Sequence, residues 1–484
     1  MKTIRIGSGA GYAGDRIEPA IALMEEGKLD YIIFECLAER TISLAQKRMQ
    51  KEPDHGYNDL FEYRFDKIWD VLKRKKVKVI TNMGAANPKA AAYKCQEMAE
   101  EKGISDLKIA YVTGDDVGNR IAEYQNIPTI ETGKPLSDIS GEILSANGYI
   151  GIQGIVEALE HGADIVITGR VADPSLTLGP LVYEFGWKMD DYKRLGKGTL
   201  AGHLLECAGQ VTGGYFADPG IKEVPKLWDL GFPIAEIEED GDCIITKLET
   251  AGGLVSEDTV KEQILYEIQD PANYFTPDVI ADFSKVKVEQ IGENRVKVTG
   301  GNGKAPNGFF KTSVGYHDSY IGEGQISYGG ENALARAELA KAILKHRLED
   351  QGLVYEEIRM DCMGIDSLYG EKISSRLENA MPIEIRLRVA ARTKDQRTAE
   401  RIGEEVEALY TNGPYGGGGA YKSVRDIISI ASILIPSEQF EISVHYLGGN
   451  RKLNYGRLHI QEQVIREIYP LFPSLHMRKK IIHF

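Results

Sequence analysis

Short apolar runs alternate with helical patterns through the first part of the chain, and this alternation limits the folds that are available to it. Helix-boundary residues support the pattern, for example Pro88 at the start of one expected helix and Gly103 after its end. The expected strands are 3–6, 31–34, 77–80, 107–112 and 163–167, and the expected helices are 15–27, 88–102 and 149–161. Strands separated by helices of this length favour βαβ units in a largely parallel, Rossmann-like sheet with flanking helices.

The second half of the chain has a different order of expected strands and helices, which favours an α+β domain with antiparallel pairing. The expected strands are 243–248, 295–298 and 384–391, the expected helices are 331–350 and 394–410, and a glycine run at 416–419 precedes an apolar segment at 427–435. Prolines, glycines and acidic residues concentrate at 225–240. We therefore expect an N-terminal α/β domain over 1–230 and a C-terminal α+β domain over 231–484.

Charge and cysteine usage exclude several classes of protein. The 58 basic and 72 acidic side chains give a formal net charge of −14, which is unfavourable for sequence-independent binding to nucleic acid or to an anionic membrane. The longest nearly unbroken apolar run, 427–435, is far shorter than the roughly 20 residues of a membrane-spanning helix. The five cysteines are scattered and odd in number, and the N-terminus shows no signal-peptide pattern. We expect a cytoplasmic protein with reduced thiols.

A glycine-rich loop follows the first expected strand. Gly9, Gly11 and Gly14 form a GxGxxG pattern, and Glu35 closes the next strand, where a ribose-binding carboxylate of a dinucleotide site would lie. Asp15 weakens this interpretation, because it places a negative charge beside the loop. The loop is therefore interpreted as a site for NAD(P), as a site for another ligand such as a carboxylate or a CoA phosphate, or as a tight turn.

Polar side chains also follow the third and fourth expected strands. Asn82 and Asn87 offer donors and acceptors to a substrate, although Asn87 is equally well placed to cap the helix that begins at Pro88. Asp115 and Asp116 lie after the next strand and can bind Mg²⁺, accept a hydroxyl proton or cap a helix. No second acidic cluster with metal spacing follows, so no metal site is predicted.

The loop after the fifth expected strand carries the strongest functional signal. Arg170 can hold a carboxylate or a phosphate in a bidentate manner, and Asp173 can orient Arg170 or act as a base. A local Arg–Asp pair that only holds the loop is the alternative. Function is favoured because loops at this edge of a parallel sheet often carry it.

A histidine and a glutamate lie three residues apart in the next expected helix. His203 and Glu206 would share one helix face and form an acid–base pair, two ligands of a metal or an ordinary helix contact. Cys207 is interpreted as a small buried apolar residue, because nothing in the sequence indicates a lowered thiol pKa. No GxSxG, HExxH or Walker A motif occurs, so serine hydrolases, zincins and P-loop proteins are not supported.

Long segments of the chain resemble the acyclic terpene utilisation (AtuA-type) family, long catalogued as a domain of unknown function. The matching segments are GSGAGYAGDR at 7–16, FECLAERT at 34–41, TNMGAANP at 81–88, ADIVITGRVADPSL at 163–176, GHLLECAGQVTGGYFADPG at 202–220, LGFPIAEI at 230–237 and TVKEQILYEIQDPANYFTPDV at 259–279. The resemblance implies a cytoplasmic protein of the catabolism of branched acids as acyl-CoA thioesters. It supplies no settled reaction and no catalytic residues, so the site assignments depend on the residues themselves.

The leading hypothesis is an enzyme of the lyase or hydratase type that acts on a branched carboxylate or acyl-CoA substrate. Its catalytic residues would be His203, Glu206, Asp173 and Asn82. Its substrate-binding residues would be Gly9, Gly11, Gly14, Glu35, Asn87, Asp115 and Arg170. No cofactor is predicted apart from the CoA moiety of a substrate.

Two alternatives remain open at this point. One is an NAD(P)-dependent oxidoreductase that uses the GxGxxG loop. The other is a non-catalytic or partner-dependent subunit, because some members of the family that the chain resembles carry a further small C-terminal domain that this chain is expected to lack. A homo-oligomer is expected from the general frequency of symmetric assemblies.

Overall fold

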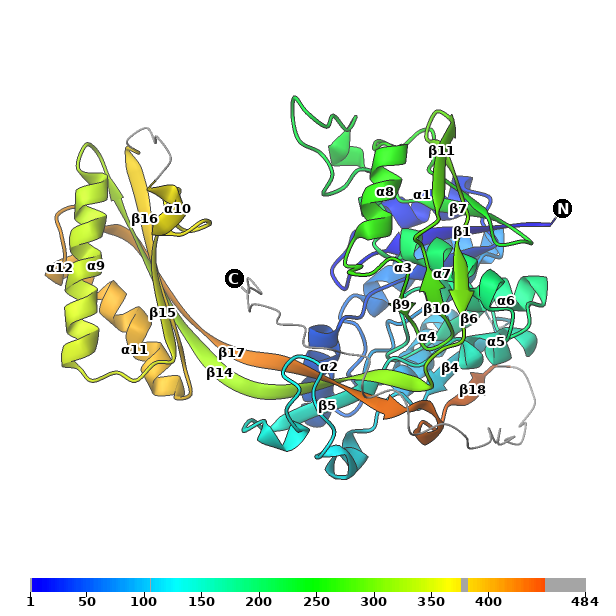
Figure 1. Ribbon diagram of the computed structural model, residues 1–484, viewed down its shortest axis with the longest axis horizontal. Coiled ribbons are helices and arrows are strands. Elements are labelled where there is room, and N and C mark those ends of the chain that lie inside the picture. Colours follow the sequence, from blue (N-terminus) through cyan, green and yellow to red (C-terminus); the bar gives the residue numbers. More distant parts are fainter. Residues whose placement is uncertain (1, 105, 376–381, 449–484) are drawn as a thin grey trace. The chain divides into compact units, whose positions relative to one another are not determined.

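The computed structural model describes residues 2–104, 106–375 and 382–448. Within these ranges the chain is a mixed α/β protein whose largest sheet has ten strands (Figure 1). The strand order is β11-β12-β8-β7-β1-β2-β3-β6-β4-β18. The bounds are β1 Thr3–Ala10, β2 Tyr31–Phe34, β3 Lys78–Thr81, β4 Ile109–Thr113, β6 Ile165–Ile167, β7 Ile234–Glu238, β8 Cys243–Thr246, β11 Lys287–Gly292, β12 Arg295–Thr299 and β18 Ser443–Leu447.

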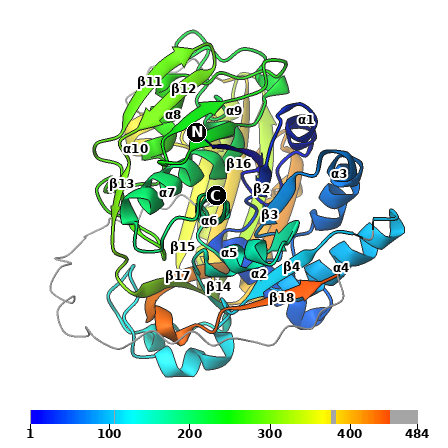
Figure 2. The same ribbon diagram turned by 90° about the vertical axis from the view of Figure 1, so that its right-hand side faces the viewer.

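The centre of this sheet is parallel, as the alternation of strands and helices predicts. Strands β1, β2, β3, β6 and β4 pair in parallel in this order, and Figure 2 shows β2 beside β3. Strand β6 returns between β3 and β4, and β1 borders an antiparallel strand on its other side. This order differs from the doubly wound arrangement of a Rossmann fold, in which the strand order reverses beside the first strand. A Rossmann-like arrangement is therefore not confirmed.

Helices cover both faces of the parallel strands. Helices α1 Glu18–Glu26, α3 Phe61–Lys75 and α4 Pro88–Glu101 share one apolar core with Ile32 and Phe34 of β2. Helices α5 Gln153–Glu160, α6 Ser175–Phe185 and α7 Tyr192–Glu206 share a second core with Tyr31 and Ile33. The strand residues alternate between the two cores because successive side chains of a strand point to opposite faces.

The ten-stranded sheet continues across the expected domain boundary. Strand β7 lies beyond residue 230, yet it pairs with β1 over Thr3–Gly7, and β8, β12 and β11 extend the sheet further. Strand β18 pairs with β4 at the opposite edge. The expected division of the chain at residue 230 is therefore not confirmed.

The second sheet has the topology of a ferredoxin-like fold. Its elements follow one another as β14 Phe309–Gly329, α9 Ala333–Asp350, β15 Glu357–Met363, β16 Glu384–Thr393, α11 Gln396–Glu407 and β17 Gly418–Pro436. The antiparallel order β15-β16-β14-β17 is that of the β-α-β-β-α-β motif. Helices α9 and α11 lie on one face of this sheet (Figure 1). We call residues 309–436 the ferredoxin-like module, and its antiparallel pairing matches the expectation for this part of the chain.

The first part of β14 also pairs with a strand of the α/β region. Strand β5 Ile143–Gly148 is antiparallel to β14 from Thr312 to Tyr316. One residue beyond this ladder, the backbone N–H of Tyr149 donates to the carbonyl oxygen of Lys311 at 2.8 Å. The pairing places residues of β14 beside the loop that follows β5.

Candidate active site

Four predicted site residues lie at one edge of the ten-stranded sheet. Glu35 follows β2, Asn82 follows β3, Arg170 follows β6 and Asp115 follows β4. These strands are parallel, so their carboxyl ends meet at the same edge, which is where open α/β sheets bind ligands. The chain thus brings these residues together from positions that are far apart in the sequence.

Glu35 and Asn82 form a buried pair. The Asn82 side chain donates to Glu35 Oε1 at 2.9 Å, and the backbone N–H of Leu37 donates to the same oxygen at 2.9 Å. Asn82 Oδ1 in turn accepts from the backbone N–H of Cys36 at 2.7 Å. Burial raises the pKa of Glu35 well above its ordinary range, and the nearby Asp173 raises it further. Asn82 therefore orients a carboxyl group whose ionised form is disfavoured by burial.

Arg170 is fully buried and holds the loop around it. Its guanidinium donates to the backbone carbonyls of Leu37 and Val171 and to the Asp173 carboxylate, and it stacks on the Tyr149 ring at 4.4 Å. Its side chain is 0% exposed, whereas that of Asp173 is 34% exposed. Burial raises the pKa of Asp173, although the Arg170 charge acts in the opposite direction. The geometry fits Arg170 as the residue that orients Asp173, and direct substrate binding by Arg170 has no geometric support.

Asp115 connects the end of β4 with two neighbouring segments. Its Oδ2 accepts from the backbone N–H of Arg170 at 2.9 Å and from the side chain of Asn147 at 2.9 Å. Burial raises the pKa of Asp115 to about 6. Because these contacts are internal, Asp115 supports the Arg170 loop.

His203 and Glu206 lie on the last turn of α7, as the three-residue spacing predicts. His203 Nδ1 is 2.6 Å from Glu206 Oε1, and both residues are buried. Burial acts to lower the pKa of His203, but the Glu206 carboxylate raises it above its ordinary value. Burial raises the pKa of Glu206 to about 7 in spite of the histidine. The pair can therefore take up or release one proton near neutral pH.

The carboxyl groups of Glu35, Asp173 and Glu206 interact electrostatically, and we call them the acid cluster. Asp173 raises the pKa of both Glu35 and Glu206, so it lies within electrostatic reach of each. Glu35 and Glu206 are buried, whereas Asp173 is partly exposed. Carboxyl groups in such unequal environments are suited to acid and base roles in one reaction.

Cys207 caps the C-terminal end of α7 and is partly exposed. Burial raises the pKa of its thiol, and the neighbouring Glu206 raises it further. A raised thiol pKa disfavours the thiolate form that a nucleophile needs. Cys207 is therefore less buried than the sequence predicts, while its raised thiol pKa favours a non-nucleophilic residue.

The protein's own backbone occupies the space beside the glycine-rich loop. Gly9 lies within β1, and a Cβ atom on Gly11 would be 2.5 Å from the carbonyl carbon of Cys207. The Asp15 carboxylate accepts from the backbone N–H of Gly11 at 2.9 Å. Helix α1 begins at Glu18, later than the expected residue 15, because Asp15 holds the loop and Pro19 occupies the first turn. The loop amide that a phosphate would need is thus already hydrogen-bonded to a carboxylate.

Asn87 and Gly14 lie away from the acid cluster's contacts. Asn87 Oδ1 accepts from the backbone N–H of Ala90 at 3.1 Å, which caps α4, and its side chain donates to the carbonyls of Pro53 and His55. Gly14 is exposed beside the Tyr12 ring. The cap accounts for Asn87 without a ligand.

Three residues that the sequence analysis did not identify surround Asp173 and Arg170. Helix α2 Glu39–Lys51 begins with Glu39, whose Oε1 accepts from the Tyr149 hydroxyl at 2.5 Å and from Lys311 Nζ at 3.1 Å. Burial would raise the pKa of Glu39, but Lys311 and Tyr149 lower it to about 2. Tyr149 follows β5 and Lys311 lies on β14, so long-range strand pairing brings them to the site.

Arg64 is a further buried cation that the sequence analysis missed. It lies on α3, is 0% exposed, and donates to the carbonyl of Asp15 at 2.9 Å and to Cys36 Sγ at 3.1 Å. It thereby ties the glycine-rich loop to the residue after Glu35. The amphipathic pattern of α3 gives no signal of this role, because Arg64 occupies a core position of the helix.

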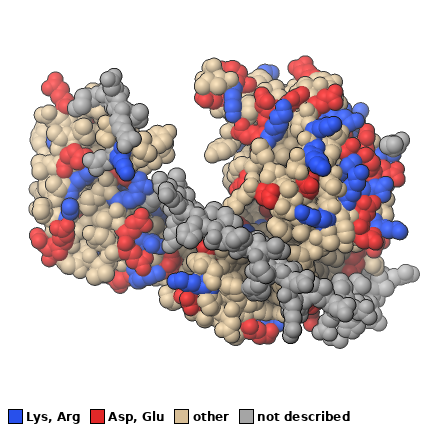
Figure 3. Space-filling model, in the orientation of Figure 1, with Lys and Arg blue, Asp and Glu red and all other residues tan. Residues whose placement is uncertain are grey.

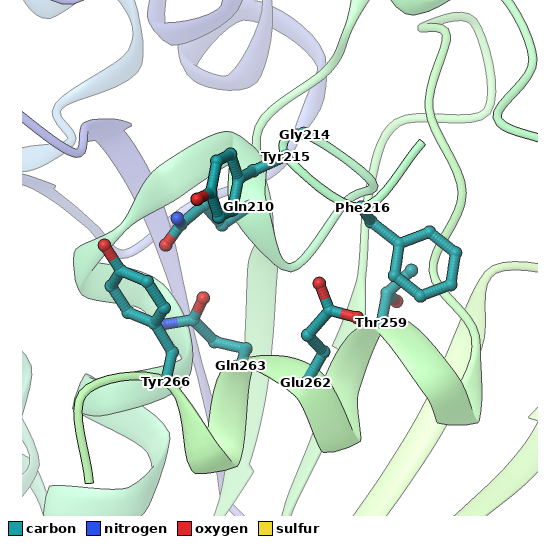
Figure 4. Close-up of a pocket in the computed structure, with 8 residues that line it drawn as sticks. All are labelled: Gln210, Gly214, Tyr215, Phe216, Thr259, Glu262, Gln263 and Tyr266. Carbon is teal, nitrogen blue, oxygen red and sulfur yellow. The ribbon is translucent and has the colours of Figure 1, made fainter. Parts of the chain in front are cut away.

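A small cavity adjoins the C-terminal end of α7 (Figure 4). Gln263 of α8 Glu257–Leu265 and Tyr266, which caps this helix, face Gln210 across it. Gln263 Nε2 also donates to the backbone carbonyl of His203 at 3.1 Å. The cavity volume is about 20 Å³, which is room for about one water molecule and not for a substrate.

Within residues 2–104, 106–375 and 382–448, no helix is long and apolar enough to cross a membrane. In the same ranges, no three His, Cys, Asp or Glu side chains are grouped as a metal site would require. Lys and Arg side chains are interspersed with Asp and Glu on the face shown in Figure 3. That face has no single-sign patch of the kind that contacts nucleic acid.

Comparison with known proteins gives one extensive match. The family model described as "Acyclic terpene utilisation family protein AtuA" matches residues 4–446, and no curated protein matches the chain. A solved structure, the de novo designed protein Foldit4, is similar over 23% of this chain and 99% of its own, with 15% identity and a TM-score of 0.16, which supports no inference about the fold. The family's description connects it with the use of acyclic terpenes, which is a catabolic role. Because its model covers nearly all of the residues, the chain belongs to the acyclic terpene utilisation (AtuA) family.

Proposed function

We propose that the protein is an enzyme that moves a proton next to the carbonyl group of a carboxylic acid or an acyl-CoA thioester, in a reaction of the lyase or hydratase type. The observation that supports this most directly is the acid cluster. It combines one partly exposed carboxyl group, Asp173, with two buried ones whose pKa values are raised. A reaction that both removes and donates a proton needs one carboxyl group that acts as a base and another that acts as an acid.

Each member of the cluster has a separate role in this proposal. The Asp173 carboxylate, oriented by Arg170, removes the proton from the carbon beside the carbonyl group. Glu35 is held by Asn82, and burial favours its protonated form, which donates a hydrogen bond to the enolate oxygen that develops. The His203–Glu206 pair supplies the proton with which a hydroxyl group leaves as water, and it takes that proton back in the hydration direction.

The NAD(P) alternative has less geometric support. The Gly11 amide is hydrogen-bonded to Asp15, and the loop packs against the backbone at Cys207. Glu35, the residue expected to hold a ribose, is buried and hydrogen-bonded to Asn82. A dinucleotide would have to displace these contacts.

The partner-dependent alternative is favoured by one observation. Tyr215, Ile221 and Trp228 are 87%, 78% and 82% exposed, and all three lie in the segment that follows the acid cluster's helix. Large exposed aromatic and aliphatic side chains are typical of protein interfaces. A companion polypeptide or a second copy of the chain would bury them.

Exchange of hydrogen for deuterium at the carbon next to the carbonyl group tests the proposed reaction. Purified protein is incubated in D₂O with branched acids and with their CoA thioesters, and deuterium incorporation is followed by mass spectrometry. We expect the Asp173→Asn variant to lose about 100-fold or more of the exchange rate. Asp190→Asn, which changes an exposed aspartate before α7, is the matched control and should exchange like the wild type.

Two results would contradict the proposal. One is an Asp173→Asn variant that exchanges at the wild-type rate. The other is an exchange reaction that the wild-type protein shows only after a companion polypeptide is added, which would favour the partner-dependent subunit instead.

A further inference from the structure

The buried position of Arg170 raises the question of which cation faces a bound anion. Arg170 is 0% exposed, and its guanidinium is hydrogen-bonded to Asp173 and to backbone carbonyls. A substrate carboxylate would have to displace these internal partners to reach it. The anion therefore needs a cation that is exposed at the same edge of the sheet.

We infer that Lys311 recognises a carboxylate group of the substrate beside Asp173, and that the substrate is accordingly a free carboxylic acid at this end. This inference rests on the proposed function, since Asp173 is there the residue that removes the proton. Lys311 lies on β14, where its backbone carbonyl accepts from Tyr149 at 2.8 Å. Its side chain is 44% exposed.

Two groups fix the position of the Lys311 ammonium. Its Nζ atom is 3.1 Å from Glu39 Oε1 and 5.0 Å from the centre of the Tyr149 ring. The Tyr149 hydroxyl donates to the same Glu39 oxygen, so the three side chains hold one another in place. An ammonium group has three N–H donors, and Glu39 accepts one of them, which leaves donors for a ligand.

Electrostatic coupling places Lys311 close to the reacting end of the site. The Lys311 charge lowers the pKa of both Glu39 and Asp173, so it acts on the base of the proposed reaction. Arg170 stacks on the Tyr149 ring at 4.4 Å, and Lys311 lies over the same ring. A carboxylate bound to Lys311 would therefore lie near the carbon from which Asp173 removes a proton.

The balance of charge at this edge also favours a single added anion at Lys311. The Asp173 carboxylate is paired with Arg170, and Glu39 is paired with Lys311. Burial raises the pKa of Glu35, which disfavours a further negative charge at this position. The exposed ammonium is the group with which an incoming carboxylate can form a new charge-assisted hydrogen bond without breaking the Arg170–Asp173 pair.

Binding of matched acids and amides tests this inference without the need for turnover. The probes are butanoate with butanamide and 3-methylbutanoate with 3-methylbutanamide, titrated into the purified full chain and followed by ligand NMR. We expect the wild type to bind each acid at least about tenfold more tightly than its amide. Lys311→Met should lose this preference, and Lys311→Arg should keep most of it.

Lys47→Met is the matched control, because Lys47 lies on α2 and forms an ion pair with Asp426 much as Lys311 does with Glu39. It should keep the preference for the acids. A wild type that binds acid and amide equally, or binds neither, overturns the inference, as does a Lys311→Met variant that still prefers the acids. Asp173→Asn separates the two proposals, because it should lose deuterium exchange while it keeps the preference for the acids.

Discussion

Carboxyl groups at the edge of the parallel strands and carboxyl groups in the ferredoxin-like module have opposite environments. At the edge, burial raises the pKa values of Glu35 and Glu206. In the module, burial would also raise the pKa of Glu323, but Arg388 at 2.8 Å and Gln325 outweigh it and lower the value. Burial thus disfavours the ionised carboxylate in one region, whereas hydrogen-bond donors and basic partners favour it in the other.

The difference shows what each region is built to do. Glu323 has basic partners on two neighbouring strands, Arg388 on β16 and Arg425 on β17, as expected of a group that stabilises a sheet. Glu206 pairs with His203, and among the residues that the structure describes its second carboxyl oxygen has no hydrogen-bond partner and is buried. An incompletely satisfied buried carboxyl group lowers stability, and such groups occur at functional sites.

Removal of one buried arginine from each region should give the largest contrast. Arg170→Met leaves the Asp173 carboxylate and the carbonyls of Leu37 and Val171 without their donor, and we expect a loss of about 3–5 kcal/mol in the free energy of unfolding. Arg388 pairs with both Glu323 and Asp361, yet Arg388→Met should cost only about 1–2 kcal/mol, because Glu323 keeps Gln325 as a donor and Asp361 keeps Arg359. Urea unfolding followed by circular dichroism measures both, and equal losses would remove the contrast.

A smaller contrast is expected in the dependence of stability on pH. Asp278 is buried in the α/β region, where it accepts from the Ile152 N–H and from Ser175 Oγ, each at 3.0 Å, and burial raises its pKa to about 6. The unfolded value is about 3.9, so the folded state binds more protons between these limits, and stability should fall by about 3 kcal/mol as the pH rises through them. Asp278→Asn should remove this fall.

Glu323→Gln tests the opposite dependence of stability on pH in the ferredoxin-like module. The pKa of Glu323 is lowered, so its contribution is present at neutral pH and is lost as the pH falls through the folded value. Asp278→Asn should therefore flatten the decline of stability above pH 4, and Glu323→Gln should flatten the decline in acid. Melting temperatures measured from pH 3 to pH 8 separate the two, and variants with the same pH profile as the wild type would contradict the assignment.

Local signals in the sequence were sufficient to predict much of the parallel sheet. The strand at Tyr31–Phe34 and the start of α4 at Pro88 agree with the structure, because an apolar run and a helix-start proline act within a few residues. The placement of Glu35, Asn82 and Arg170 at one edge follows from the same parallel pairing. These features needed no information about distant contacts.

Long-range pairing accounts for what the sequence did not reveal. Lys311 and Tyr149 reach the site because β14 pairs with β5, and no local motif marks either residue. The continuation of the sheet from β1 to β7 is likewise a contact between residues that are more than 200 positions apart. Hydrophobic periodicity indicates that a strand exists but does not indicate its partner.

The smallest expected contrast concerns two glycines and tests whether the GxGxxG pattern reflects close backbone packing or phosphate binding. A Cβ atom on Gly11 would be 2.5 Å from backbone atoms of Cys207, so Gly11→Ala should cost about 1–3 kcal/mol in the free energy of unfolding. Gly418→Ala in β17 is the control, since a Cβ atom there meets nothing within 4 Å and the change should be neutral or slightly stabilising. If Gly11 instead approached a dinucleotide, Gly11→Ala would weaken NAD⁺ or NADP⁺ binding and leave stability unchanged. Unfolding and nicotinamide-binding titrations on the same two variants decide between close backbone packing and phosphate binding.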